Sequence, residues 1–203
     1  MEKTIERDIG LAQDMTDNKA SAHIKRVLAR ATCLYNSDQV EKALKAMAYE
    51  IHQDLEDKDP VVLCVLIGGV VLTGKLLTLL DFPLQVDYIH ATRYGDNTTG
   101  SEIAWVAKPR VSLKGRTVLI VDDILDRGVT LAEIVDYCKA QGAAEIRTAV
   151  LVEKEVTRPV DAVQKADYTG ITVENRYVFG YGMDYKGYLR NAPGIFYVAP
   201  EDQ

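Results

Sequence analysis

Cysteine, histidine and long apolar runs are scarce in this sequence. The chain has three cysteines, which lie far apart among apolar neighbours: Cys33, Cys64 and Cys138. An odd number of widely spaced cysteines does not suit a disulfide framework, so we predict reduced core residues and a cytoplasmic protein. No apolar run approaches the roughly 20 residues that cross a bilayer, and the opening MEKTIERDIG is charged from its second residue. Neither export nor membrane insertion is therefore expected.

The sequence also lacks a stripe of positive charge. Its formal net charge is −6 and no run of lysine and arginine stands out, so no nucleic-acid partner is expected. The histidines are scattered and are assigned no metal or catalytic role: His23, His52 and His90. What is present is a chain of 203 residues, 47% apolar and 27% charged, which is typical of one folded globular domain. An enzyme or a binding protein is the expectation.

Residues 1–60 have a helical pattern, most clearly from Asp38 onward. The apolar residues fall on one helical face: Val40, Leu44, Met47, Ala48, Ile51 and Leu55. Asp38 with Glu41 is predicted to form a capping box, and the polar stretch that ends at Pro60 is predicted to stop the helix.

The middle of the chain alternates between strand and helix patterns. The predicted strands cover residues 61–67, 84–91, 103–107, 118–121 and 146–152, and the predicted helices cover residues 70–80 and the stretch from 131 to a stop at Gly142. The polar loop 93–102 has no apolar anchor and is expected to be mobile. This alternation predicts an α/β fold with a mostly parallel sheet flanked by helices, and a ligand crevice at the carboxyl ends of the strands.

The stretch VLIVDDILDRGVTL, residues 118–131, carries the strongest functional signal. Because ionised carboxylates are rarely buried without a partner, the apolar strand is expected to end at Asp122 and Asp123 and to present both to water, a cation or a polar ligand. Residues 126–130 lead into a helix, so backbone N–H groups at this turn favour a phosphate. Gly128 allows close backbone approach, and Thr130 can cap the helix or donate its hydroxyl to the anion.

Other interpretations of the acidic stretch account for fewer residues. A plain helix start with solvated acids would suit a lone D-x-G-x-T, and a phospho-receiver domain would need its acids nearer the start of the domain. A P-loop nucleotidase is a sharper rival, because residues 69–76 nearly match G-x-x-x-x-G-K-[ST]. Leu76 has no hydroxyl for magnesium, however, so Lys75 is interpreted as a surface lysine on a helix.

The acidic stretch resembles the signature of type I phosphoribosyltransferases. VLCVLIGG, RYG with its following loop, LVEK and RYVFGYGMDYKGYLR resemble, in order and spacing, pieces of the hypoxanthine-guanine phosphoribosyltransferases over about residues 60–198. The resemblance implies transfer of a ribose 5-phosphate from phosphoribosyl pyrophosphate (PRPP) to a purine nitrogen, with Mg²⁺ as cofactor. It also implies one domain, residues 1–203, with a helical N-terminal region (1–60), a core (61–155), and the rest of the core with a small hood over the base (156–203).

The resemblance implies which residues of the site bind PRPP. It places Asp122 and Asp123 at the ribose hydroxyls, directly or through magnesium. The 5-phosphate is assigned to the turn residues Asp126, Arg127, Gly128, Val129 and Thr130. The pyrophosphate contacts are assigned to the backbone at Ile67, Gly68 and Gly69 and to Arg190, with Asp184 as a magnesium ligand. Arg93 and Tyr94 are assigned to a lid that excludes water.

The base half of the site follows from the same resemblance. Asp126 matches the acid that accepts a hydrogen bond or proton from purine N7. Lys154 matches the lysine that donates to the 6-oxygen and selects against 6-amino purines, although Glu153 beside it leaves the alignment open by one residue. Tyr177 resembles the aromatic that stacks on the base, and Val178 the residue whose backbone reads its edge.

The resulting hypothesis is a purine salvage enzyme for 6-oxopurines, with PRPP and a purine base as partners and a homodimer or homotetramer as its assembly. The preference among hypoxanthine, guanine and xanthine stays open. The alternative is a regulator that keeps the PRPP site, senses nucleotides and does not catalyse transfer. The presence of Lys154, Tyr177 and Asp184 favours catalysis.

Overall fold

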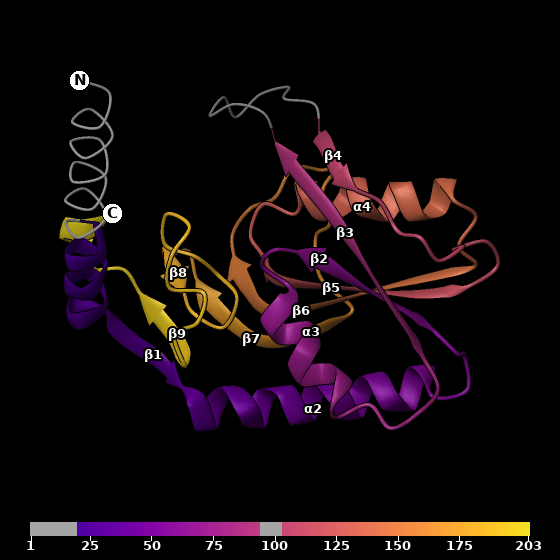
Figure 1. The fold of residues 1–203 in the computed structure, drawn as a ribbon, viewed down its shortest axis with the longest axis horizontal. Helices are drawn as coiled ribbons and strands as arrows, with labels where there is room; N and C mark the ends of the chain where they lie inside the picture. The colour runs from indigo at the N-terminus through magenta and orange to yellow at the C-terminus, as the bar shows by residue number, and fades with distance from the viewer. Residues whose placement is uncertain (1–19, 94–102) are drawn as a thin grey trace, which may run out of the picture.

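A six-stranded sheet forms the centre of this computed structural model, which describes residues 20–93 and 103–203 (Figure 1). The strand order is β4-β3-β2-β5-β6-β7, and every neighbouring pair is parallel except β3 with β4. The strands are β2 (Val61–Leu66), β3 (Gln85–Arg93), β4 (Ile103–Ala107), β5 (Thr117–Leu125), β6 (Glu145–Glu155) and β7 (Tyr168–Glu174). The predicted α/β fold with a mostly parallel sheet is therefore confirmed.

Helices cover both faces of this sheet (Figure 1). Helices α2 (Ser37–Leu55) and α3 (Val70–Leu77) pack on one face, and α4 (Val129–Ala140) packs on the other. Successive residues of a strand point to opposite faces, so Leu119 and Val121 join the α2–α3 core while Val118 and Ile120 join the α4 core. A continuous apolar run is what a strand buried on both faces requires.

Helix α2 buries the predicted apolar face, but its cap differs from the prediction. All six apolar residues of that face are buried. The N-cap is Asn36, whose side chain accepts from the N–H of Gln39 at 3.0 Å while the Gln39 side chain accepts from the N–H of Asn36 at 3.0 Å. The capping box is therefore Asn36 with Gln39, and the predicted pair of Asp38 with Glu41 was wrong.

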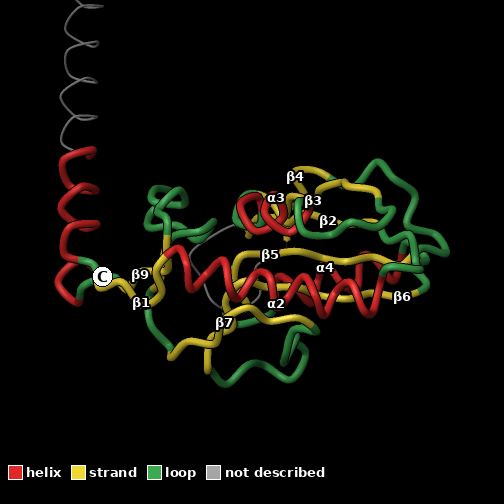
Figure 2. The backbone as a smooth tube through the Cα atoms, turned by 90° about the horizontal axis from the view of Figure 1, so that it is seen from below, coloured by secondary structure: helices red, strands yellow, loops and turns green. Residues whose placement is uncertain are grey.

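A second, three-stranded sheet lies beside the main one and joins the two ends of the described chain (Figures 1 and 2). Its order is β1 (Thr32–Asn36), β9 (Gly194–Tyr197), β8 (Val178–Phe179), and all its pairs are antiparallel. A helix over residues 20–30 and the 3₁₀ turn η1 (Pro200–Asp202) pack beside it through a small core that includes Val27, Tyr185 and Val198. The prediction of helix throughout residues 1–60 is therefore wrong at β1.

Two further predictions fail at the level of single residues. Strand β5 does not end at Asp122 but continues to Leu125, because β6 pairs with it as far as Leu125. Cys33 is exposed, whereas Cys64 and Cys138 are buried. All three are free thiols, so the prediction of reduced cysteines is confirmed, but the prediction of a core position is wrong for Cys33.

Among the described helices, none has the length and apolar character needed to span a membrane.

Helix α3 does not form a phosphate loop. Lys75 lies in the last turn of the helix and its Nζ is 2.5 Å from Oε1 of Glu41 on α2. Leu76 is fully buried. Lys75 is thus a surface residue that pairs with a neighbouring helix, as interpreted from the sequence, and the P-loop reading is not supported.

Candidate active site

A cleft of about 1160 Å³ opens at the carboxyl ends of β2, β5 and β6, beside the small sheet. The cleft brings together nearly all of the predicted site residues: Gly68, Asp122, Asp123, Asp126, Arg127, Gly128, Val129, Thr130, Lys154, Tyr177, Val178, Asp184 and Arg190. Gly69 does not line the cleft but directly follows Gly68 as the N-cap of α3. Arg93 ends β3 and its side chain is outside the described part of the structure, as is all of Tyr94. Segments far apart in the sequence therefore meet at the predicted edge of the sheet.

The acidic pair lies inside β5 and is linked to two residues of the C-terminal segment. Asp123 is buried, and its backbone N–H donates to Asp122 Oδ1 at 2.9 Å. Arg190 Nη1 is 3.6 Å from Asp123 Oδ2, and Arg190 Nη2 is 2.7 Å from Asp184 Oδ1. The Arg190 guanidinium thus lies between the carboxylates of Asp123 and Asp184, and it also donates to the Gly182 carbonyl at 2.5 Å.

Burial dominates the electrostatics of this pair. The pKa of Asp122 is raised by burial and then by the charge of Asp123, although the Arg190 guanidinium opposes the shift. Burial also raises the pKa of Asp123, and Arg190 again opposes it. Two neighbouring carboxylates, one buried and one half-buried, with a single arginine nearby favour a cation or hydroxyl donors as ligands.

Glycines let the loop after β2 lie directly against the acidic pair. A Cβ added at Gly68 would be 2.1 Å from Asp123 Oδ2, and one added at Gly69 would be 2.5 Å from the Val121 carbonyl oxygen. Gly182 has a φ of +111°, and its Cβ would be 2.2 Å from the Gly68 carbonyl oxygen. No other residue type fits at these positions without displacing backbone or a cleft carboxylate.

The turn between β5 and α4 has the geometry of an anion site. Gly128 is the N-cap of α4, has a φ of +72°, and makes no side-chain capping bond. Thr130 therefore does not cap the helix, which corrects one of its two predicted roles, and its half-buried side chain lines the cleft. The first N–H groups of a helix have no intrahelical acceptor, so those of α4 are free to bind an anion at this edge of the cleft.

Lys154 and Asp126 form an ion pair inside the cleft. Lys154 Nζ is 2.7 Å from Asp126 Oδ2, and the exposed fractions of the two side chains are 11% and 44%. Glu153 points to the other face of β6, where its Oε2 accepts from Thr169 Oγ1 at 2.7 Å. Because side chains alternate along a strand, Lys154 lines the cleft and Glu153 does not.

Tyr177 and Val178 come from the edge of the small sheet. Tyr177 is half-buried and its ring lies 5.7 Å from the ring of Tyr185, measured between centroids. Val178 begins β8 and is buried. An aromatic face and a backbone edge thus border the same cleft as the Lys154–Asp126 pair.

Sequence reasoning missed several residues of the site and its support. Arg176 and Tyr197 line the cleft, and the Arg176 guanidinium lies 4.8 Å from the centre of the Tyr197 ring. Gln203 also lines it and donates through Nε2 to Tyr197 Oη at 3.1 Å. Arg158 lies behind the cleft and donates to several backbone carbonyls. Arg176 directly precedes Tyr177 in the motif, which was a usable signal, whereas the other three carry no local pattern.

The described residues contain no cluster of three or more histidine, cysteine or acidic side chains that could enclose a metal ion. Asp184 Oδ2 accepts from the N–H of Gly187 at 2.7 Å and Oδ1 pairs with Arg190, but the side chain is 34% exposed and each oxygen keeps a second lone pair for a cation. Mg²⁺ commonly uses one or two carboxylates together with substrate phosphates and water. The cleft residues fit a Mg²⁺ ion that arrives with a phosphorylated substrate, not one held in a protein cage.

An α/β sheet with an acidic pair, a helix start and an aromatic side chain at the carboxyl ends of its strands is typical of proteins that bind phosphorylated ligands. Residues 31–186 match the family model described as phosphoribosyl transferase domain, and the chain belongs to this family. The hypoxanthine-guanine-xanthine phosphoribosyltransferase of Tritrichomonas foetus is 34% identical over 89% of this chain and 95% of the relative. The hypoxanthine-guanine phosphoribosyltransferase of Bacillus subtilis is 31% identical over 82% and 92%.

Solved structures agree with the sequence relatives. A hypoxanthine phosphoribosyltransferase from Staphylococcus aureus superposes with a TM-score of 0.78 at 26% identity, over 84% of this chain and 92% of that one. The resemblance inferred from the motifs, the fold class and the enzyme class are confirmed.

Proposed function

We propose that this phosphoribosyltransferase transfers the 5-phosphoribosyl group of PRPP to a 6-oxopurine and releases pyrophosphate. The observation that carries the proposal is the arrangement of three groups around one cleft that Tyr177 also lines: the acidic pair, the start of α4, and the Lys154–Asp126 ion pair. The curated relatives named above act on hypoxanthine, guanine or xanthine according to their names, which supports the same substrate class here.

The PRPP half of the site would use strong acceptors and backbone donors. Asp122 and Asp123 would accept hydrogen bonds from the ribose hydroxyls, because ionised carboxylates are the strongest acceptors available for them. Residues 126–130 would hold the 5-phosphate through N–H groups, with the exposed Arg127 adding a cation at the rim. The backbone at Gly68 and Gly69 and the Arg190 side chain would contact the pyrophosphate. Arg93 and Tyr94 remain a predicted lid.

The base half would combine stacking with one donor and one acceptor. Tyr177 would stack on the purine and the backbone at Val178 would meet its edge. Lys154 would donate to the 6-oxygen, and Asp126 would accept the proton of N7 so that N9 becomes the better nucleophile. A 6-amino purine would place a donor against the Lys154 ammonium, so adenine would be rejected.

Magnesium belongs to this proposal as the cofactor, with Asp184 as its protein ligand and Asp122 and Asp123 nearby. When bound, Mg²⁺ would neutralise the charge that builds up on the departing pyrophosphate. The raised pKa values of the acidic pair support a cation nearby, because an added positive charge relieves the repulsion between the two carboxylates.

We also propose a cytoplasmic homodimer or homotetramer. The three free thiols support a reducing compartment. On the α3 side of β3, Val70, Val86 and Tyr88 are 46%, 48% and 42% exposed and line one groove of about 500 Å³. Exposed apolar surface of this kind marks interaction sites. Light scattering of the wild type and of Tyr88→Asp tests the assembly, with a shift to a smaller mass expected for the variant.

Product formation tests the function directly. The protein is incubated with PRPP, MgCl₂ and, in parallel, hypoxanthine, guanine, xanthine or adenine, and nucleotide and pyrophosphate are quantified. Turnover of at least one 6-oxopurine without turnover of adenine is expected. Binding of PRPP without turnover of any base would overturn the proposal and would favour a nucleotide-sensing regulator, for which a gel shift at physiological salt is the next assay.

A further inference from the structure

Arg158 is an almost fully buried arginine that binds backbone carbonyls at the back of the site. Its side chain is 6% exposed and it does not line the cleft. Its Nε donates to the Asp126 carbonyl at 2.8 Å, and its Nη2 donates to the carbonyls of Leu125 at 3.1 Å and Lys154 at 2.6 Å. Nη1 donates to the Gln164 carbonyl at 2.9 Å. One guanidinium thus joins the turn after β5, the end of β6 and the loop before β7.

The donors of this guanidinium are almost completely used. Arginine has five N–H donors in a rigid planar arrangement, and four of them meet carbonyl oxygens here. The remaining side of Nη1 faces Glu153, whose Oε1 lies 3.8 Å away and supplies the opposite charge. Lysine has three donors on a flexible stem and cannot reproduce this pattern.

The bonds to Leu125 and Asp126 fix the orientation of two successive peptide units. In a planar trans peptide the C=O and the following N–H point in opposite directions. Because both carbonyls point to Arg158, the N–H groups of Asp126 and Arg127 point away from it. Among the described residues, no hydrogen-bond acceptor is recorded for the N–H of Arg127. Arg127 lines the cleft, so a ligand bound there is the natural acceptor for this donor.

The loop that carries Arg158 also supports the next residues of the turn. The Val163 N–H donates to the Gly128 carbonyl at 3.2 Å, and a Cβ at Gly128 would be 2.4 Å from the Val163 carbonyl oxygen. Gln164 closes the same loop by donating from Nε2 to the carbonyls of Pro159 at 2.6 Å and Ala162 at 2.9 Å. The back of the anion-binding turn is therefore held by one folded loop with Arg158 at its centre.

We propose that Arg158 is a positioning residue that presets the 5-phosphate site by holding the peptide units of Leu125 and Asp126, and that it fixes this turn relative to Lys154. This inference rests on the proposed function, because the ligand of the turn is taken to be the 5-phosphate of PRPP. Arg158 does not contact the ligand itself. Its removal affects the part of the site that binds the 5-phosphate, while the Gly68–Gly69 backbone on the other side of the acidic pair keeps its geometry.

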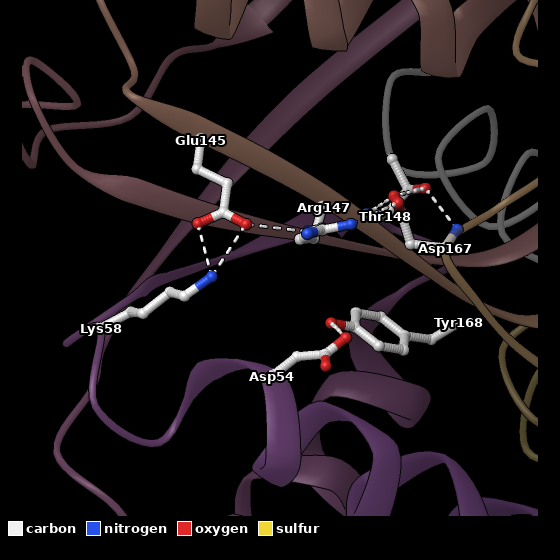
Figure 3. Close-up of polar contacts among 7 residues, drawn as sticks. All are labelled: Asp54, Lys58, Glu145, Arg147, Thr148, Asp167 and Tyr168. Carbon is white, nitrogen blue, oxygen red and sulfur yellow. Dashed lines mark hydrogen bonds and ion pairs between the residues drawn. The ribbon is translucent and has the colours of Figure 1, made fainter.

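Arg147 provides a matched control on the same strand. It lies toward the opposite end of β6, is 37% exposed, and pairs with Glu145 at 3.0 Å and Asp167 at 3.3 Å (Figure 3). Figure 3 shows Glu145 between Arg147 and Lys58, with Thr148 donating to Asp167 beside them. Arg147 therefore binds carboxylates far from the cleft residues of β6, whereas Arg158 binds carbonyls behind them.

Two ligands separate the two halves of the PRPP site. Equilibrium binding of ribose 5-phosphate and of pyrophosphate, each with MgCl₂, is measured for the wild type, Arg158→Lys and Arg147→Lys. Because small displacements of positioning groups can cost about 100-fold, we expect Arg158→Lys to weaken ribose 5-phosphate binding by about 10- to 100-fold. Pyrophosphate affinity is expected to stay close to that of the wild type, and Arg147→Lys is expected to change neither. Equal loss of both ligands in Arg158→Lys, or no loss, would overturn the assignment.

Two further variants keep the test decisive if Arg158→Lys folds poorly. Glu153→Gln removes the carboxylate partner but leaves the carbonyl acceptors, so ribose 5-phosphate binding is expected to remain near that of the wild type; a loss as large as that of Arg158→Lys would assign the effect to the ion pair instead. Millimolar guanidinium is expected to restore ribose 5-phosphate binding to Arg158→Ala but not to change its binding to Arg147→Ala, and absence of restoration contradicts the inference.

The failure of this inference can be told apart from the failure of the proposed function. A wild type that turns over no purine would contradict the proposed function. An active wild type whose Arg158 variants bind ribose 5-phosphate normally would contradict only this inference.

Discussion

Lys154 and Asp126 face each other across 2.7 Å in the cleft, with the lysine much the more buried of the two. The lysine needs this acceptor, because a largely desolvated ammonium is costly without one. A purine with a 6-oxygen and an N7 proton could satisfy both groups at once. The proposed function therefore uses both members of this ion pair at the edge of the base.

Replacement of Asp126 tests its role as acceptor of the N7 proton. Asp126→Asn keeps the shape of the side chain but cannot take a proton, so we expect kcat to fall by about 10²- to 10⁴-fold, the usual contribution of a general base. PRPP affinity is expected to change little, because the backbone of the turn supplies the phosphate donors. Steady-state kinetics with equilibrium PRPP binding measures both quantities. Equal losses in the two would contradict the assigned role.

Replacement of Lys154 tests the selection of the 6-substituent. Lys154→Met keeps the length of the side chain and removes the donor, so kcat/KM for hypoxanthine is expected to fall by about 10- to 100-fold, which is the range for a charged hydrogen bond. The preference for hypoxanthine over adenine is expected to shrink as well. Lys139→Met, on the exposed face of α4, serves as the control and is expected to behave as the wild type. An unchanged ratio of hypoxanthine to adenine would argue against Lys154 as the selector.

Much of the fold could be predicted from local patterns, because the buried strands are short apolar runs and each is followed by glycine or acidic residues. Strand β1 could not be predicted in this way. Thr32–Asn36 becomes a strand by pairing with β9, which lies near the other end of the sequence. Its neighbours on both sides are helical, so local propensity extended the helix across it.

The sequence indicated most of the residues that line the cleft but not the residues that support them. The strand was expected to end at Asp122 because the partners of the acids were not visible; Arg190, which balances Asp123, comes from a distant segment. Arg158 is one arginine in an irregular loop, and nothing around it in the sequence indicates four carbonyl acceptors. Sequence motifs identify residues expected to contact ligands. The residues that support these motifs are brought there by tertiary contacts, which local sequence does not reveal.

The raised pKa of Asp122 predicts a specific dependence of stability on pH. An acid whose pKa is raised in the folded state stays protonated at pH values where the unfolded chain has lost that proton. Its contribution to stability is therefore fully present below the ordinary pKa of aspartate and is lost as the pH rises through the raised value. In Asp122→Asn this loss is absent, so the free energy of unfolding is expected to fall less with rising pH than in the wild type.

Urea unfolding from pH 4 to pH 8 without magnesium measures this difference. Asp57→Asn changes an exposed aspartate in the turn after α2 and is expected to follow the wild type. Addition of MgCl₂ with pyrophosphate is expected to stabilise the wild type more than Asp122→Asn. If the free energy of unfolding changed with pH in the same way in Asp122→Asn and in the wild type, the raised pKa of Asp122 would make no contribution to stability and the prediction would be wrong.

Two glycines of adjoining segments test the packing of the loop on the acidic pair. In Gly68→Ala the new methyl group would lie 2.1 Å from Asp123 Oδ2, so the loop or the carboxylate must move, and we expect a strong loss of both activity and pyrophosphate binding. Gly74→Ala is the matched control, because no atom lies within 4 Å of its added Cβ and the residue is inside helix α3. There the substitution is expected to stabilise the fold by about 0.5–1 kcal/mol, the helix preference of alanine over glycine. Kinetics, pyrophosphate binding and thermal unfolding are measured for both variants. The comparison separates a steric effect at the site from a general effect of an added methyl group. Wild-type activity in Gly68→Ala would show that the close contact between Gly68 and Asp123 is not required for activity.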